Sequence, residues 1–155
     1  MPRLYCDANP RCIAYVLDGG GSGYQDLPSG HTSMEAEYLS IIYGLNEYFL
    51  KWNRELDARQ SDMNKESLAA AELDHRQSEF YQAGNPSDRT KRLLPPPVLV
   101  LSDNEVVVNQ LIRQYHIGDD RLRRLAQRVW QMTQNIDVKY EWCSRNENLA
   151  GKMLK

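Results

Sequence analysis

Two aspartates in this sequence directly follow apolar segments, where a charged side chain is unusual. Asp7 comes after Leu4-Tyr5-Cys6, and Asp103 comes after the apolar run 98–101 and Ser102. An ionised carboxylate beside a buried strand needs a partner or a cation, because an unpaired buried charge is costly. Functional groups collect at the carboxyl ends of strands in open sheets, so we expect both aspartates at one sheet edge. The structural alternative is a strand-end cap at Asp7 and a helix N-cap at Asp103.

A third carboxylate should approach this edge from the first long helix, which we expect to begin near Thr32. Thr32-Ser33-Met34-Glu35 is a capping box, in which Glu35 already has a structural role. Glu35 and Glu37 both flank the apolar stripe of the helix, so periodicity does not choose between them. The capping role of Glu35 leaves Glu37 as the better ligand candidate. The structural alternative is that Glu37 is an ordinary surface residue. Three hard oxygen donors suit Mg²⁺ or Mn²⁺ rather than zinc.

The elements that would position these residues alternate along the chain. We expect strands at 4–7, 11–17, 24–27, 98–101 and 138–142. We expect helices from about 32, from 106 to near Gly118, over 122–132, and after 148. The glycine-rich segment 19–23 lacks the Walker lysine and a following helix, so a hairpin connection is favoured over a phosphate cradle. This order predicts an α/β fold with a five-stranded mixed sheet and helices on both faces.

We expect a single domain over 1–155 with an insertion at about 53–97, after the first helix. Its first part, through about residue 83, has helical composition with charges of both signs, and Gly84-Asn85-Pro86-Ser87 ends it. Pro95-Pro96-Pro97 forms a stiff spacer. A mobile arm, a protein-partner-binding element and a substrate clamp remain open for this segment.

Composition limits the classes of function. The 155 residues are 41 % hydrophobic and 26 % charged, which is typical of one folded domain. No apolar run is long enough to cross a bilayer, and the first residues lack the apolar core of a signal peptide, so we expect a cytoplasmic protein. The three cysteines form no CxxC pair and are expected to be buried and reduced.

Charge is distributed unevenly along the chain. Net charge is -2, yet residues 121–155 hold eight basic and three acidic residues. This stretch, including Arg124 and Arg128, is a candidate face for a phosphate backbone, and the alternative is a solvated helix face.

The motifs around the three carboxylates together resemble type 1 ribonuclease H domains. The resemblance rests on Asp7-Ala8-Asn9 before a glycine-rich hairpin, on the Ala36-Glu37 helix continuing to Gly44-Leu45, on Val98 to Asn104 with Val106-Val107-Val108-Asn109-Gln110, and on Lys139 to Leu154. It covers the whole chain except the insertion. Each motif is weak alone, but four in the family's order are fairly specific. The resemblance implies a ribonuclease H-like fold with Asp7, Glu37 and Asp103 at the metal-binding positions.

The sequence departs from the family pattern at the fourth carboxylate. An Ala-Asp pair opens the family's last helix, and here the pair is Ala150-Gly151. Glu147, on the loop just before, is a candidate substitute. The family's loop histidine is missing, because Cys143-Ser144-Arg145 occupies that region. The family's basic handle is also absent, and the arginines of 121–128 are expected to replace it in part.

The resemblance implies hydrolysis of the RNA strand of RNA–DNA hybrids by a two-metal mechanism, with two ions (Mg²⁺ or Mn²⁺). Asp7 would bridge both ions, while Glu37 and Asp103 would hold the ion on the leaving-group side. Without the fourth aspartate, activity is expected to be slow, Mn²⁺-dependent or absent. The expected substrate-binding residues are Asn9, Asn104, Arg124, Arg128 and Arg145.

Two other functions fit the same sequence. The first is a nucleic-acid-binding module that kept the fold and lost turnover, for which Gly151 and the missing histidine are the arguments. The second is another nuclease on this fold, such as an exonuclease or a junction resolvase. Proofreading exonucleases usually show Asp-x-Glu in the first strand, and Asp7-Ala8-Asn9 departs from that pattern.

Overall fold

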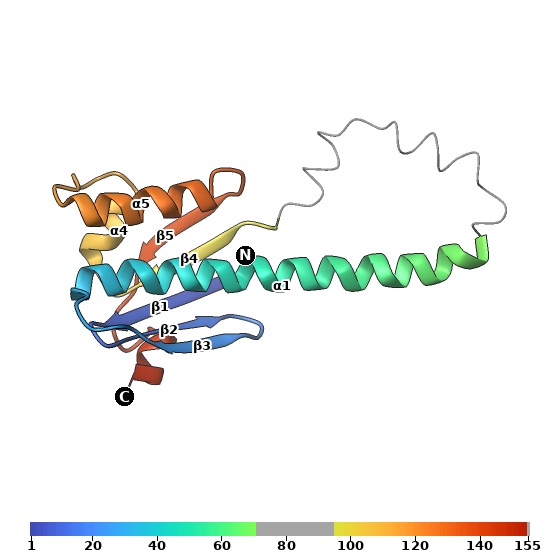
Figure 1. The fold of residues 1–155 in the computed structure, drawn as a ribbon, viewed down its shortest axis with the longest axis horizontal. Coiled ribbons are helices and arrows are strands. Elements are labelled where there is room, and N and C mark those ends of the chain that lie inside the picture. Colours follow the sequence, from blue (N-terminus) through green and yellow to red (C-terminus); the bar gives the residue numbers. More distant parts are fainter. Residues whose placement is uncertain (71–94, 155) are drawn as a thin grey trace. The chain divides into compact units, whose positions relative to one another are not determined.

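The computed structural model describes residues 1–70 and 95–154, and in this part of the chain five strands form one mixed sheet (Figure 1). The strands are β1 (Arg3–Asn9), β2 (Cys12–Leu17), β3 (Ser22–Asp26), β4 (Val98–Ser102) and β5 (Val138–Trp142). The helices are α1 (Ser33–Ala70), α4 (Glu105–Leu111), α5 (Asp120–Met132) and the 3₁₀ helix η1 (Leu149–Leu154). Every strand expected from the sequence is present, with bounds shifted by a few residues. The helix expected to end near Gly118 ends at Leu111, because Arg113 adopts a positive φ that a helix cannot continue through.

The order of the strands across the sheet is β3-β2-β1-β4-β5. β1, β2 and β3 form an antiparallel meander, while β4 pairs in parallel with β1 and with β5. The glycine-rich segment is the hairpin connection between β2 and β3, where Gly19, Gly20 and Gly21 all have positive φ. This confirms the predicted mixed sheet.

The register of β1 corrects one detail of the prediction. Asp7 does not end the strand, because β1 continues to Asn9 and pairs with β2 through Asn9 and Cys12. What ends just before Asp7 is the parallel pairing with β4, whose last pair is Cys6 and Ser102. Asp7 and Asp103 therefore follow the same rung of two neighbouring parallel strands, which lie about 4.8 Å apart.

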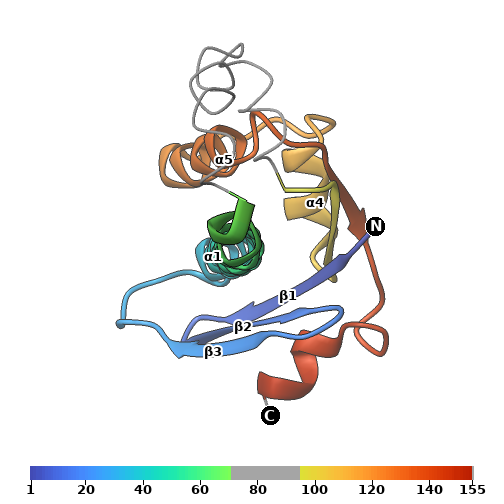
Figure 2. The same cartoon turned by 90° about the vertical axis from the view of Figure 1, so that its right-hand side faces the viewer.

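Helices cover both faces of the sheet, as predicted. Residues 33–48 of α1 lie over one face, and η1 packs against β1 and β2 on the other (Figure 2). Buried Tyr38, Ile41 and Leu45 form the apolar stripe of α1. Gly44 lets α1 approach the sheet closely, since a Cβ there would lie 3.1 Å from the Leu4 side chain.

The start of α1 is capped as predicted on one side only. The Thr32 hydroxyl accepts from the Glu35 N–H at 3.1 Å, which satisfies one of the free donors of the first turn. The second half of the expected capping box is wrong. The Glu35 carboxylate lies 3.2 Å from His31 Nδ1 and 3.8 Å from the Arg121 guanidinium, and these side chains are its partners in place of the backbone N–H of the cap.

The chain divides into two compact units, residues 1–48 with 96–155 and residues 49–95. In the second unit α1 continues to Ala70, and the Arg59 guanidinium lies 6.0 Å from the centre of the Trp52 ring. The expected helix end at Gly84-Asn85-Pro86-Ser87 lies outside the described residues. Within the described part of the chain, no helix has the length and apolar character needed to span a bilayer.

Candidate metal centre

The structure brings Asp7, Glu37 and Asp103 together. Each offers one carboxylate oxygen, and these three oxygens lie within 4.8 Å of one another. Asp7 comes from β1, Glu37 from the second turn of α1, and Asp103 from the turn between β4 and α4. They open into a cavity of about 470 Å³. Its lining residues are Asp7, Ala8, Glu37, Asp103, Arg145, Asn146, Gly151 and Lys152.

Glu37 is the most buried of the three carboxylates, with 6 % of its surface exposed. Burial, followed by the negative charges of Asp7 and Asp103, raises its pKa from 4.5 to about 9. Its Oε2 is buried without a hydrogen-bond partner among the described residues. A buried oxygen without a donor, beside two further carboxylates, fits a site for a cation.

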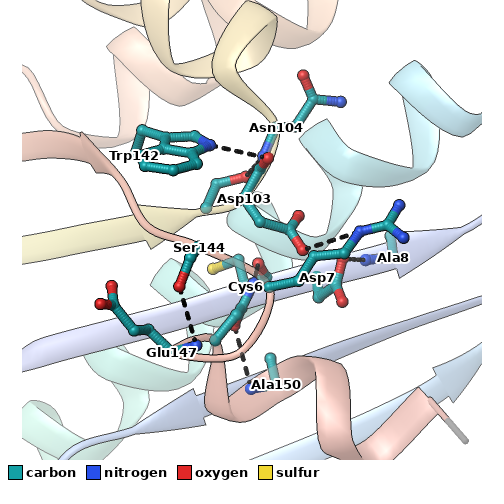
Figure 3. A network of polar contacts seen from close by, with 12 residues as sticks. Cys6, Asp7, Ala8, Asp103, Asn104, Trp142, Ser144, Glu147 and Ala150 are labelled. Carbon is teal, nitrogen blue, oxygen red and sulfur yellow. Dashed lines mark hydrogen bonds and ion pairs between the residues drawn. The ribbon is translucent and has the colours of Figure 1, made fainter.

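A hydrogen bond from β5 holds the backbone of Asp103, and its side-chain carboxylate lies in the same cluster as that of Asp7. The Trp142 indole N–H donates to the Asp103 backbone carbonyl at 3.1 Å (Figure 3), and Arg145 Nε lies 3.9 Å from Asp103 Oδ2. Burial and the charge of Asp7 raise the pKa of Asp103, against the lowering effect of Arg145. The alternative role as helix cap falls to Asn104 instead, whose side-chain oxygen accepts from Val107 N–H at 3.1 Å.

The segment before η1 is fixed to the sheet by Asn148, whose importance the sequence did not reveal. Asn148 is fully buried; its amide donates to the Cys6 carbonyl at 2.9 Å and accepts from the Ala150 N–H at 3.1 Å. Cys6 precedes Asp7, so this contact places η1 beside the carboxylates. A Cβ at Gly151 would lie 2.9 Å from Asp7 Oδ2, so position 151 faces the cluster although glycine supplies no ligand.

Cations flank the carboxylates on the open side of the cavity. Arg145, predicted to bind substrate, lines the cavity with a side chain that is 93 % exposed. Lys152 lines it as well and was missed, because a single lysine in a short tail carries no sequence signal. Both can meet an anion that approaches from solvent.

The remaining candidate residues lie elsewhere or have structural roles. Glu147 is not part of the carboxylate cluster, and in Figure 3 its side chain points away from Asp7 and Asp103. Asn9 uses its side-chain oxygen to accept from the N–H groups of Arg11 and Cys12 at the β1–β2 turn. Arg124 and Arg128 are exposed on α5 and do not line this cavity.

The donor set fits a hard divalent cation. Carboxylate oxygens are the ligands that Mg²⁺ and Mn²⁺ prefer, and no thiol or imidazole joins the cluster among the described residues. Asp7, Glu37 and Asp103 would hold the ion.

Comparison with known proteins gives matches only at the level of structure. No protein-family model matches the chain, and no curated protein sequence matches it. The ribonuclease H1 of the archaeon Halobacterium salinarum is similar, with a TM-score of 0.62 and 19 % identity over 99 % of this chain and 92 % of that one. The N-terminal RNase H domain of a Mycobacterium tuberculosis protein has a TM-score of 0.60 and 16 % identity, over 95 % of this chain and 84 % of the other.

A third similar structure was solved with nucleic acid. It is LC11-RNase H1 in complex with an RNA/DNA hybrid, with a TM-score of 0.61 and 14 % identity over 100 % of both chains. The three matches cover 99 %, 95 % and 100 % of this chain. Together with the strand order and the helices on both faces, they show that this chain folds as a ribonuclease H-like domain.

Proposed function

We propose that this chain is a divalent-metal-dependent nuclease that hydrolyses the RNA strand of RNA–DNA hybrids. The observation that carries the proposal is the convergence of Asp7, Glu37 and Asp103 within 4.8 Å at one sheet edge of a ribonuclease H-like fold. A hybrid is bound by the similar LC11-RNase H1, which supports the same substrate class here.

The chemistry follows from what the side chains can do. Divalent ions (Mg²⁺ or Mn²⁺, two expected) would supply a water of lowered pKa and would neutralise charge on the departing oxygen. Asp7, Glu37 and Asp103 would hold them in the cavity. Arg145 and Lys152 stand on its open side, where they would receive the scissile phosphate. Asp7 is the carboxylate of this cluster that a Cβ at position 151 would approach, at 2.9 Å from its Oδ2.

The test is cleavage of a labelled RNA–DNA hybrid by the purified protein, with Mg²⁺ and with Mn²⁺. We expect product with at least one ion, and none from Asp7→Asn under the same conditions. Cleavage by Asp7→Asn at the wild-type rate would show that the activity comes from a contaminating nuclease. Cleavage of duplex DNA but not of hybrid would move the assignment to another nuclease on this fold.

One observation favours a second candidate, a nucleic-acid-binding module without turnover. Gly151 faces Asp7 but adds no carboxylate, so the site has three acidic ligands among the described residues. Tight hybrid binding with no cleavage by either ion would establish this alternative.

A further inference from the structure

A second cavity, of about 440 Å³, lies where α4, the loop 112–119 and α5 meet. It is lined by Gln110, Arg113, Tyr115, His116, Ile117, Arg123, Gln127 and Trp130. Two arginines and a histidine line it together with two aromatic rings, and no carboxylate is among the lining residues of the described chain. This composition is opposite to that of the metal centre and fits an anion with aromatic neighbours.

Arg113 is held in place by its neighbours in this cavity. Its guanidinium lies 4.2 Å from the centre of the Trp130 ring, and the Trp130 indole N–H donates to the Leu111 carbonyl at 3.1 Å. Stacking uses the face of a guanidinium and leaves the N–H groups along its edge free for a phosphate. Among the described residues, no acidic side chain pairs with Arg113. The other arginine, Arg123, already donates to the Ile117 carbonyl at 3.0 Å.

The backbone conformation at position 113 is unfavourable for arginine. It follows the end of α4 with φ at 64°, a left-handed position where glycine is the usual residue. A side chain there costs conformational energy unless it contributes elsewhere. The helix end by itself therefore does not explain an arginine, whereas its position over Trp130 in a cavity that Arg123 and His116 also line does.

The cavity lies near the metal centre. Gln110, one of its lining residues, accepts a buried hydrogen bond from the Tyr38 hydroxyl at 2.6 Å, and Tyr38 follows Glu37 in α1. α4 separates Asp103 from the loop and rises about 10 Å. Figure 1 places that loop at the same end of the sheet as the start of α1.

We propose that this second cavity binds a backbone phosphate of the same nucleic acid, through Arg113, at a position other than the reacting phosphate. The inference rests on the proposed function for its substrate class. Arg113 binds and positions the duplex and takes no part in the chemistry. Tyr115 and His116 border the same phosphate from the loop.

The decisive variant is Arg113→Gly, because glycine suits the left-handed backbone while the charge is lost. Binding of a labelled RNA–DNA hybrid is measured by fluorescence anisotropy in EDTA at several salt concentrations. We expect affinity to fall about threefold and the slope of log K against log salt to drop by about 0.9, the contribution of one phosphate contact. The thermal midpoint should equal or exceed that of the wild type.

Two further variants serve as controls. Arg113→Lys keeps the charge and should keep the salt slope. Arg3→Gln removes one exposed positive charge at the amino end of β1, away from Asp7, and should leave binding unchanged. A wild-type slope for Arg113→Gly, or an equal loss in Arg3→Gln, would overturn the inference.

The design separates this inference from the proposed function. Binding in EDTA does not require hydrolysis, so an inactive protein whose slope still drops in Arg113→Gly supports the cavity and refutes the hydrolase. Hydrolysis by the wild type together with an unchanged salt slope in Arg113→Gly supports the hydrolase and refutes the phosphate site in the second cavity. Inorganic phosphate alone is the last probe: if it stabilises the wild type but not Arg113→Gly, while hybrid binding is equal in both, the cavity is a free-anion site and the inference is wrong.

Discussion

At the scale of single residues, Glu37 is the most strongly perturbed group of the candidate metal centre. Its carboxyl is buried between two other carboxylates, and its pKa is raised to about 9. Without a cation, the folded state therefore binds a proton between about pH 4.5 and 9 that the unfolded chain has released. This stabilising contribution is complete below about pH 4.5 and is lost as the pH rises towards 9.

We therefore expect the thermal midpoint in EDTA to fall as the pH rises from 5 to 9, by at least about 2–4 °C, the shift that 1 kcal/mol causes in a domain of this size. Glu37→Gln should flatten this fall, since glutamine stays neutral throughout. Glu141→Gln, at an exposed position on β5, is the matched control and should keep the wild-type dependence. Identical pH profiles for Glu37→Gln and the wild type would contradict the burial argument.

Asp103 supports a second prediction at the residue scale. Asp103→Asn keeps the shape of the side chain and removes its charge, so hydrolysis should fall by more than the 10- to 100-fold loss typical of groups that only orient ligands. The fold should survive, because the Trp142 indole N–H bonds to the Asp103 backbone and not to its side chain. Turnover is measured beside a circular dichroism spectrum. Wild-type turnover would remove Asp103 from the site.

At the scale of elements, the sheet edge and η1 decide which groups meet. β1 and β4 bring Asp7 and Asp103 to the same rung, and Asn148 fixes η1 against Cys6 so that position 151 faces Asp7. The short 3₁₀ helix therefore presents position 151 to the carboxylate cluster, where glycine adds no carboxylate.

Gly151→Asp should restore a fourth carboxylate. We expect Mg²⁺ affinity, measured by calorimetry, to rise roughly tenfold, with a gain in hydrolysis if metal binding limits it. The Asp7 side chain must shift slightly, because a Cβ at 151 lies 2.9 Å from its Oδ2. Gly151→Asn imposes the same steric demand without the charge. Equal Mg²⁺ affinities for the two variants would show that position 151 does not reach the ions.

At the scale of the whole molecule, charge is separated along the chain. The net charge is -2, but negative charge is concentrated in the carboxylate cluster at the sheet edge and positive charge in the stretch from 121 to 155. Arg124 and Arg128 lie on the exposed side of α5, opposite buried Ala126 and Val129. Nucleic acid would thus be held by local patches, and overall charge does not decide binding.

Combining Arg124→Ala with Arg128→Ala should weaken hybrid binding and lower its salt slope by up to about 1.8, the value for two phosphate contacts. The measurement is the same anisotropy titration in EDTA. Because neither side chain lines the metal cavity, the turnover number at saturating hybrid should not change. An unchanged salt slope would make this face of α5 a solvated surface.

The sequence by itself determined the elements and the candidate carboxylates of this protein. Local patterns are sufficient there: the run 98–101 is apolar on both faces, Thr32 caps a helix, and the stripe of Tyr38, Ile41 and Leu45 recurs with helical period. The choice of Glu37 over Glu35 depended on a capping box of which only half is present, yet Glu37 is the residue that joins the cluster.

Only the tertiary structure decided what depends on contacts between distant residues. It paired Asn148 with Cys6, turned Gly151 towards Asp7, left Glu147 outside the carboxylate cluster, and placed Arg113 over Trp130. These contacts join residues far apart in the sequence or depend on the direction of a side chain in a loop. Periodicity specifies which face of an element is buried, whereas packing alone specifies which partner meets that face.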